Sequence, residues 1–192
     1  MKSIGVVLAG GNSRRFGKPK AFAAYKGKPF YERACEVLEP YVDDVVIVGR
    51  QEWGSFSSRK ILFDVEAFRG KGPLAGIYSV MKKMPAEWYV VLACDMPLMD
   101  VSIIERLLCE CEQNPETDAI VPYLDDCLQP LAAVYHRTSL HELESVLMED
   151  KLKVKDFLAL IRVSYIHGFD SAPFQNVNTK EELHRMDKEA SE

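Results

Sequence analysis

The chain has 192 residues, of which 47% are hydrophobic and 28% charged, and a formal net charge of −5 at pH 7. This length can bury a substantial core without a disulfide or metal, so we expect one domain over residues 1–192. The acidic balance argues against a nucleic-acid partner, and no apolar run approaches the roughly 18 residues that a membrane span requires. Five scattered cysteines without the paired spacing of zinc sites favour a reducing, cytoplasmic environment.

Apolar runs alternate with segments of helical spacing along the chain. The runs at residues 4–9, 45–49 and 88–94 are apolar throughout, which is typical of strands covered on both faces. Further elements are predicted over these ranges: strands 60–65, 119–123 and 130–135, and helices 30–39, 74–84, 103–114, 138–149, 153–161 and 179–190. This order predicts an α/β fold with a three-layer, doubly wound, mostly parallel, Rossmann-like sheet.

Ligands of such a fold collect beyond the carboxyl ends of its strands. The segments that follow the predicted strands, and that we therefore expect to meet at one site, are residues 8–20, 64–76, 94–100 and 174–178. The first of them reads LAGGNSRRFGKPK, and residues 1–33 hold eight Lys or Arg against the single acid Glu32. Glycine lets backbone amides approach an anion closely, so this basic loop favours a small polyanion such as phosphate over a merely solvated basic face.

Two common phosphate-binding motifs do not fit this loop. A P-loop needs four residues between its glycines and then Lys-Ser/Thr, whereas Gly11 and Gly17 are separated by five residues and Lys18 is followed by Pro19. The glycine spacing also differs from the G-x-G-x-x-G fingerprint of dinucleotide-binding folds. The loop therefore belongs to neither class.

The loop at residues 8–20 instead resembles L-A-G-G-x-S-x-R-M-G-x-D-K, the nucleotide loop of the molybdenum cofactor guanylyltransferases. The family's other motifs follow in the same order and span almost the whole chain: GPLAGI at 72–77, CDMPLM at 94–99, QPLAAVY at 129–135 and FQNVNTKEEL at 174–183. Two positions depart from the pattern. Phe16 replaces a residue that is often Met, and Pro19 removes a carboxylate beside Lys20, so no role of that aspartate carries over.

The resemblance implies a fold like that of the nucleotide-diphospho-sugar transferases and the transfer of GMP from GTP to the terminal phosphate of the molybdenum–molybdopterin cofactor, with release of pyrophosphate. It implies Lys20, Asp95 and Arg14 as catalytic residues. The GTP-binding residues that it implies are Leu8, Ala9, Gly10, Gly11, Lys20, Asp64, Gly72 and Asp95. It also implies partner proteins that deliver the cofactor and molybdoenzymes that accept the product.

Two acidic residues in these segments have alternative interpretations. Asp95 follows the apolar run 88–94, where a buried carboxylate needs a counter-charge. The resemblance assigns Asp95 to Mg²⁺, a cation commonly held by one or two carboxylates and substrate phosphates; the alternative is a strand-end Asp that caps the next turn. The resemblance implies that Asp64 contacts the guanine nucleotide; the alternative is that Asp64 is a solvated polar residue of the loop. Asp100 is predicted to cap the helix that follows it.

The last motif contains Asn176 and Asn178. Thr179 and Glu182 form a capping box, so we expect a helix to start there and an extended segment to precede it, with both asparagines on one face and Val177 in the core. Two amides suit a neutral heterocycle, and the resemblance places the pterin substrate on this side of the cleft. The alternative is that they satisfy loop backbone.

Two other functions compete with this prediction. One is a cytidylyltransferase or a sugar-phosphate nucleotidylyltransferase of the same fold; LAGG in place of LAAG and the lack of a G-x-G-T-R loop argue against it. The other is a noncatalytic nucleotide-binding module, which the presence of both Lys20 and Asp95 disfavours.

Overall fold

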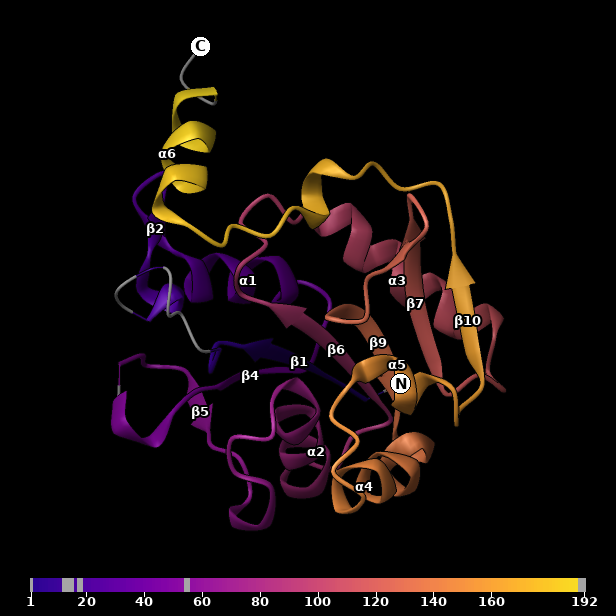
Figure 1. Cartoon of the computed structure of the whole chain (residues 1–192). Helices are drawn as coiled ribbons and strands as arrows, with labels where there is room; N and C mark the ends of the chain where they lie inside the picture. Colours follow the sequence, from indigo (N-terminus) through magenta and orange to yellow (C-terminus); the bar gives the residue numbers. More distant parts are fainter. Residues whose placement is uncertain (1, 12–15, 17–18, 54–55, 190–192) are drawn as a thin grey trace.

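The predicted apolar runs form the central sheet in a computed structural model, which describes residues 2–11, 16, 19–53 and 56–189 (Figure 1). Within these residues the sheet has eight strands in the order β10-β7-β9-β6-β1-β4-β5, with β8 paired to β7. The strands are β1 (Ser3–Leu8), β4 (Asp44–Val48), β5 (Lys60–Leu62), β6 (Trp88–Ala93), β7 (Ala119–Leu124), β8 (Cys127–Leu128), β9 (Ala132–His136) and β10 (Val163–Ile166). A separate small hairpin pairs β2 (Ala24–Tyr25) with β3 (Lys28–Pro29).

The sheet is mostly parallel, as expected. β1 runs parallel to β4 and β6, β4 to β5, and β7 to β10, whereas β9 is antiparallel to both β6 and β7. The reversal follows from the short connection between β7 and β9, because parallel neighbours need a crossover of a dozen or more residues.

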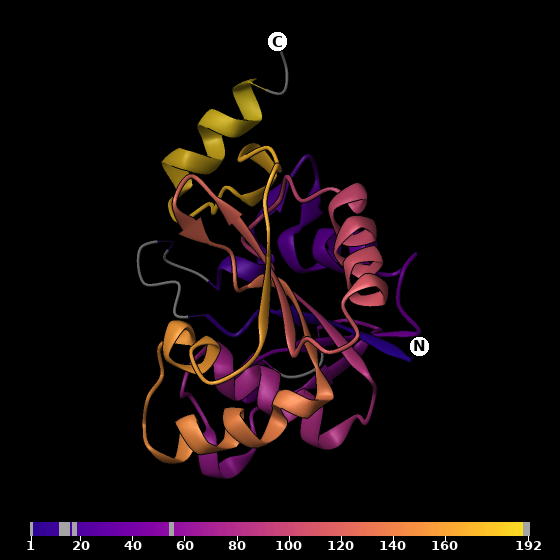
Figure 2. The same cartoon turned by 90° about the vertical axis from the view of Figure 1, so that its right-hand side faces the viewer.

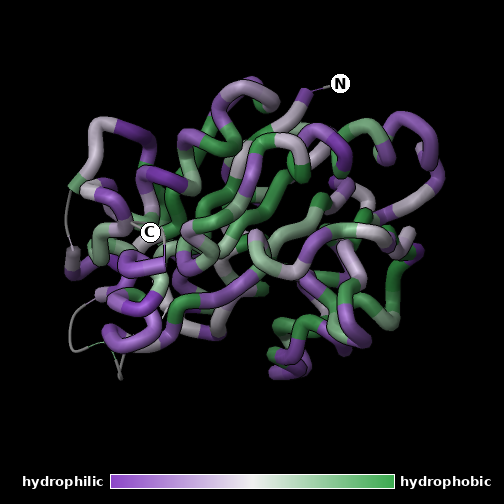
Figure 3. Tube along the Cα trace, turned by 90° about the horizontal axis from the view of Figure 1, so that it is seen from above, coloured by the Kyte–Doolittle hydropathy of each residue, from purple (hydrophilic) through white to green (hydrophobic). Residues whose placement is uncertain are grey.

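Helices cover both faces of the sheet and make three layers. In Figure 1, α1 (Phe30–Leu38) and α3 (Val101–Gln113) lie above the sheet, and α2 (Pro73–Lys83) and α4 (Leu140–Met148) lie below it, with α5 (Val154–Leu158) packed against α4. Alternate side chains of one strand enter the two cores: Val7 packs on the α1 side, and Ile4 and Val6 on the α2 side. The strand segments in the middle of the molecule are accordingly mostly green in Figure 3.

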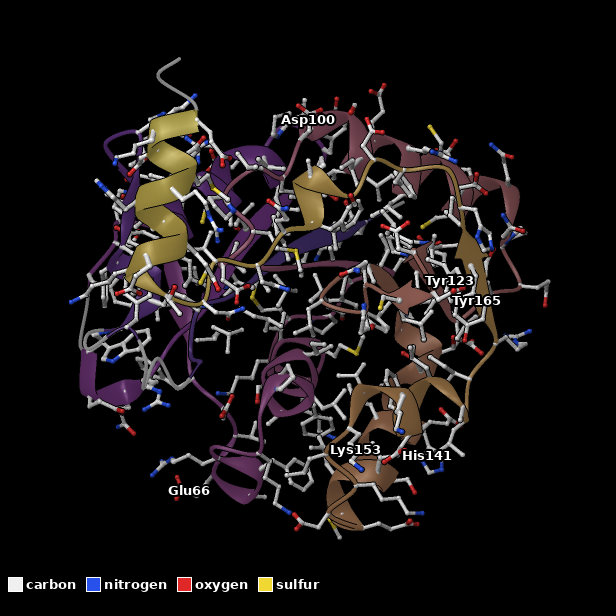
Figure 4. The ribbon with its side chains drawn as sticks, turned by 45° about the horizontal axis from the view of Figure 1, so that its top comes forward. Glu66, Asp100, Tyr123, His141, Lys153 and Tyr165 are labelled. Carbon is white, nitrogen blue, oxygen red and sulfur yellow. The ribbon has the colours of Figure 1, made fainter. Side chains whose placement is uncertain are left out.

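The helix starts follow local sequence signals. The Asp100 carboxylate accepts the Ser102 N–H at 2.8 Å, so the predicted cap of α3 is confirmed, and Asp100 stands at the start of that helix in Figure 4. At α6 (Lys180–Glu189), Glu182 N–H donates to the Thr179 hydroxyl at 3.1 Å and the Glu182 carboxylate accepts the Thr179 N–H at 3.2 Å. The capping box is therefore also confirmed.

Some boundaries differ from the prediction. The helix predicted over 153–161 is shorter, and the one over 138–149 begins with a 3-10 turn, η4 (Arg137–Ser139). Other short 3-10 turns are η1 (Lys20–Phe22), η2 (Gln51–Trp53), η3 (Glu66–Phe68) and η5 (Ala172–Phe174). β10 was not predicted, because this edge strand buries a single hydrophobic side chain, Ile166, and leaves Tyr165 exposed beside Tyr123, with their ring centres 6.4 Å apart (Figure 4).

The last part of the chain crosses the fold. After β10 it runs over the α1 and α3 side of the sheet and ends in α6, which stands at the periphery in both Figure 1 and Figure 2. Phe174 and Val177 anchor this segment in the core, where they are 5% and 1% exposed. Among the helices of the described residues, none combines the length and apolar character needed to cross a membrane.

Candidate active site

A cavity of about 1180 Å³ opens where β1, β4 and β6 end. All four segments expected at the carboxyl ends of the strands contribute to its wall. Its lining includes every site residue predicted from the sequence within the described part of the chain: Leu8, Ala9, Gly10, Gly11, Lys20, Asp64, Gly72, Asp95, Asn176 and Asn178. Arg14, the remaining predicted residue, lies outside the described residues. The doubly wound topology therefore gathers residues that are far apart in sequence.

The glycine-rich loop is fixed at its base by the neighbouring strand β4. Ala9 N–H donates to the Val48 carbonyl at 2.9 Å, and Arg50 Nε donates to the Gly10 carbonyl at 2.9 Å. These bonds hold residues 9 and 10 against the end of β4, where residues 8–11 line the cavity.

The GPLAGI segment forms the opposite wall. Gly72 precedes α2 with a φ of 81°, a conformation that favours glycine, and Pro73 occupies the first turn. At Gly76 a Cβ would come within 3.0 Å of Val48 and 3.1 Å of Leu8, so glycine is needed for α2 to pack closely on the sheet. Gly72, Pro73 and Gly76 line the cavity at the start of α2.

Lys20 and Asp95 form an ion pair inside the cavity. Lys20 Nζ lies 2.7 Å from Asp95 Oδ2, and the two side chains are 15% and 21% exposed. The other carboxylate oxygen, Asp95 Oδ1, is buried and has no hydrogen-bond partner among the described residues. An orphaned anionic oxygen is costly in the interior, so this atom is suited to a cation.

Asn178 is the second partner of Lys20. Its Oδ1 accepts a hydrogen bond from Lys20 Nζ at 2.9 Å. Asn176 and Asn178 both line the cavity while Val177 is buried, which agrees with the predicted alternation of an extended segment. Val177 N–H donates to the Asp95 carbonyl at 2.9 Å and so joins this segment to the end of β6.

Asp64 lies beyond β5 in another part of the wall. Its Oδ2 accepts the Gly70 N–H at 2.9 Å. Burial raises the pKa of the Asp64 carboxyl above its ordinary value, and the Gly70 hydrogen bond opposes that shift. Asp64 is thus a partly desolvated acceptor beside Gly70 and Gly72.

Cys94 also lines the cavity but is not a suitable nucleophile. Burial, with the neighbouring Asp95 charge, raises the pKa of its thiol well above the ordinary value, so it stays protonated at neutral pH. In the ranges that the structure describes, no group of three or more His, Cys, Asp or Glu residues could hold a metal ion.

Several cavity residues were not predicted from the sequence. Outside the predicted segments and the family motifs, the lining residues are Val48, Gly49, Arg50, Gln51, Glu52, Phe63, Ala93, Leu128 and Val154. Arg50 could have been found by the same rule as the others, because it follows the predicted strand 45–49 directly. Leu128 to Leu131 enter the site because β9 reverses direction, which the apolar pattern does not reveal.

Comparison with known proteins identifies the family. Residues 5–164 match the family model of the MobA-like NTP transferase domain. The chain belongs to this family. It is 42% identical over 195 residues to a Bacillus licheniformis protein named "Probable molybdenum cofactor guanylyltransferase", with 97% of each chain covered. It is 37% identical to the protein of the same name from Bacillus subtilis, covering 100% of this chain and 98% of that one.

Solved structures agree with the fold of a MobA-like NTP transferase. Molybdopterin-guanine dinucleotide biosynthesis protein A from Archaeoglobus fulgidus matches with a TM-score of 0.83 and 27% identity over 98% of both chains. The 2-C-methyl-D-erythritol 4-phosphate cytidylyltransferase from Thermus thermophilus has a TM-score of 0.72 at 13% identity, covering 97% of this chain and 98% of that one, and shows the shared fold alone. The expected resemblance, the fold class and the assignment as a nucleotidyltransferase are confirmed.

Proposed function

We propose that the chain transfers GMP from GTP to the terminal phosphate of the molybdenum–molybdopterin cofactor and releases pyrophosphate. The choice of substrates follows the names of the relatives at 42% and 37% identity and the Archaeoglobus structure. The observation that carries the proposal is the Lys20–Asp95 ion pair in the wall of the cavity that the glycine-rich loop also lines. Lys20 supplies a positive charge for the phosphates of a metal–triphosphate, and the Asp95 carboxylate supplies a negative charge for its metal ion.

The nucleotide occupies the side of the cavity formed by the strand ends. The Ala9 N–H is already donated to the Val48 carbonyl, so the phosphates are bound by backbone amides that follow Ala9 in the loop, beginning with Gly10, and Lys20 neutralises their charge. Arg14, which lies outside the described residues, adds positive charge in the same loop. Asp64 and Gly72 contact the nucleoside, where the partly desolvated Asp64 carboxylate accepts hydrogen bonds.

The proposed metal is Mg²⁺, and Asp95 is its protein ligand. The fit rests on Asp95 Oδ1, a buried carboxylate oxygen without a partner among the described residues. Magnesium prefers oxygen ligands and is commonly held by one or two carboxylates together with substrate phosphates, which agrees with a single acid at this position. When bound, Mg²⁺ would neutralise charge on the phosphates and polarise the phosphorus that is attacked.

The chain's own part in the reaction is positioning and charge stabilisation. The acceptor's terminal phosphate is the nucleophile, so the protein does not have to supply a nucleophilic side chain. The protonated Cys94 thiol is consistent with this role of the acceptor. Asn176 and Asn178 hold the pterin with paired amide donors and acceptors. Lys20 stabilises the negative charge that develops as the phosphate bond breaks.

The remaining proposals concern the setting of the reaction. We propose a cytoplasmic enzyme that works as a single domain, receives its acceptor from cofactor-delivering proteins and passes the product to molybdoenzymes. These proposals follow from the free cysteines, of which Cys35, Cys94 and Cys111 are buried, and from the family's place in cofactor synthesis.

Titration calorimetry with GTP, CTP and ATP in the presence of Mg²⁺ tests the proposed donor. We expect the tightest binding for GTP. Tighter binding of CTP would favour a cytidylyltransferase of the same fold, and equal affinity for all three nucleotides would contradict guanine selectivity.

A further inference from the structure

Among the described residues, Asp95 and Asn178 hold Lys20 from two different parts of the fold. Its Nζ lies 2.7 Å from Asp95 Oδ2, at the end of β6, and 2.9 Å from Asn178 Oδ1, just before α6. One partner is an anion and the other is a neutral amide. Lys20 therefore connects the strand end that faces the donor nucleotide with the C-terminal segment that faces the acceptor.

The backbone on the acceptor side is fixed independently of Lys20. Val177 is 1% exposed and its N–H donates to the Asp95 carbonyl at 2.9 Å. The Asn178 N–H donates to Glu182 Oε2 at 2.6 Å. The donated backbone hydrogen bonds lower the pKa of the Glu182 carboxyl, so this acceptor stays ionised at neutral pH. Because the segment is anchored on both sides of Asn178, the Asn178 side chain can change its partner without movement of the chain.

The two bonds to Lys20 differ in strength. A hydrogen bond between an ammonium group and a carboxylate or phosphate is charged on both sides, whereas the bond to an amide oxygen is charged on one side only. When a triphosphate enters beside Lys20, it competes with both partners. The bond to Asn178 is the weaker one, so it is the bond that Lys20 gives up.

We propose that Asn178 is a positioning residue that holds Lys20 on the acceptor side until a nucleotide binds, and that nucleotide binding frees the Asn178 amide for the acceptor. The donor nucleotide then binds first and the acceptor second. This inference rests on the proposed function, because it requires a nucleotide phosphate at Lys20.

Two substitutions at Asn178 give opposite expectations. Asn178→Ala removes the amide that competes for Lys20, so the affinity for Mg²⁺–GTP should rise about 3- to 10-fold. Asn178→Asp adds a carboxylate that holds Lys20 more strongly, so the affinity should fall about 10-fold or more. Damage to the fold would weaken GTP binding in both variants, whereas the proposal requires tighter binding in Asn178→Ala and weaker binding in Asn178→Asp.

Asn176→Ala is the matched comparison, because Asn176 lines the same cavity from the same segment, two residues before the Asn178 that bonds to Lys20. Its affinity for Mg²⁺–GTP should stay within about 2-fold of the wild type. Titration calorimetry without acceptor measures all four proteins, and circular dichroism checks their folds. Weaker binding in both Asn178 variants, or no change in either, would overturn the inference.

A second measurement tests the order of binding. Molybdopterin is titrated into the wild-type protein with and without an α,β-methylene analogue of GTP, which cannot transfer GMP. We expect a gain in molybdopterin affinity of about 3-fold or more when the analogue is present. Equal affinity in both titrations contradicts the order. If the wild type binds no GTP at all, the proposed function itself fails, which is a different result from GTP binding that ignores Asn178.

Discussion

Lys20 Nζ lies 2.7 Å from Asp95 Oδ2, although 75 residues separate the two in sequence. The pair is brought together because Lys20 follows the loop after β1, Asp95 follows β6, and these two strands are parallel neighbours. The two side chains are 15% and 21% exposed, so both charges are partly shielded from water. Electrostatic interactions are stronger in such a partly buried environment than in water. The proposed function assigns the phosphates to one member of this pair and the metal to the other.

Replacing Lys20 with alanine removes the positive charge that pairs with Asp95. We expect kcat/KM to fall by roughly 2–4 kcal/mol of transition-state stabilisation, which corresponds to about 30- to 1000-fold. Lys28→Ala is the control, because Lys28 pairs with Glu36 at the surface and does not line the cavity. Near-wild-type kcat/KM in Lys20→Ala would remove Lys20 from the catalytic residues.

Replacing Asp95 with asparagine tests the metal assignment. The shape of the side chain and the backbone bond from Val177 to the Asp95 carbonyl are retained, so the fold should survive while activity collapses. The dependence of the residual activity on Mg²⁺ concentration should shift to much higher concentrations, because the anionic ligand is lost. Asp126→Asn, in the exposed β7–β8 turn, serves as the control. An unchanged magnesium titration contradicts Asp95 as the ligand.

Asp64 is tested with a nucleotide that lacks one donor group. ITP has no N2 amine, so a pocket whose carboxylate accepts from guanine should bind GTP more tightly than ITP. In Asp64→Asn we expect GTP affinity to fall by about 1–3 kcal/mol and the preference for GTP over ITP to shrink. Calorimetry with both nucleotides gives the ratio directly. A preference that persists in the variant would place the recognition of guanine elsewhere.

Asp118 provides a prediction about stability that is separate from the site. It accepts two hydrogen bonds from the Arg162 guanidinium, each 3.0 Å long, and one from the Thr138 hydroxyl at 2.6 Å. The Arg162 hydrogen bonds are the main reason that the pKa of Asp118 is held well below its ordinary value. A lowered folded-state pKa stabilises the fold above the ordinary pKa of Asp, and this contribution is lost as the pH falls toward the folded-state value.

Asp118→Asn should therefore lower the free energy of unfolding by about 1–3 kcal/mol at pH 7, and its difference from the wild type should narrow below about pH 4. Urea unfolding at pH 7, 5 and 3.5 measures both effects. Glu116→Gln is the matched control, because Glu116 contacts the same arginine from a fully solvated position and should change stability little. If the free energies of unfolding of the wild type and Asp118→Asn differ by the same amount at every pH, the lowered pKa of Asp118 is not the cause of the difference.

Much of the fold could be predicted because its signals are local. The apolar runs that became β1, β4 and β6 are buried on both faces, and the caps at Asp100 and Thr179 lie within three residues of the groups they satisfy. The rule that ligands bind beyond strand ends then identified four segments, all of which line the cavity. The family motifs supplied the residue assignments in those segments.

The rest depends on contacts between distant segments. The order of the strands, in which β9 lies between β6 and β7, is one example, because the apolar pattern does not specify which strands become neighbours. The bond from Lys20 to Asn178 joins residues 158 positions apart and needs the whole C-terminal segment to cross the fold. The sequence predicted Asn178 as a pterin ligand, and its contact with Lys20 could be found only in three dimensions.

The most direct test of the proposed activity is a turnover assay with molybdenum–molybdopterin, Mg²⁺ and each nucleoside triphosphate in turn. Transfer is followed by the appearance of pyrophosphate and of the dinucleotide form of the cofactor. We predict that GTP gives both products, that Mg²⁺ is required, and that CTP and ATP give little of either. Transfer from CTP in preference to GTP, or nucleotide binding without any transfer, would contradict the account.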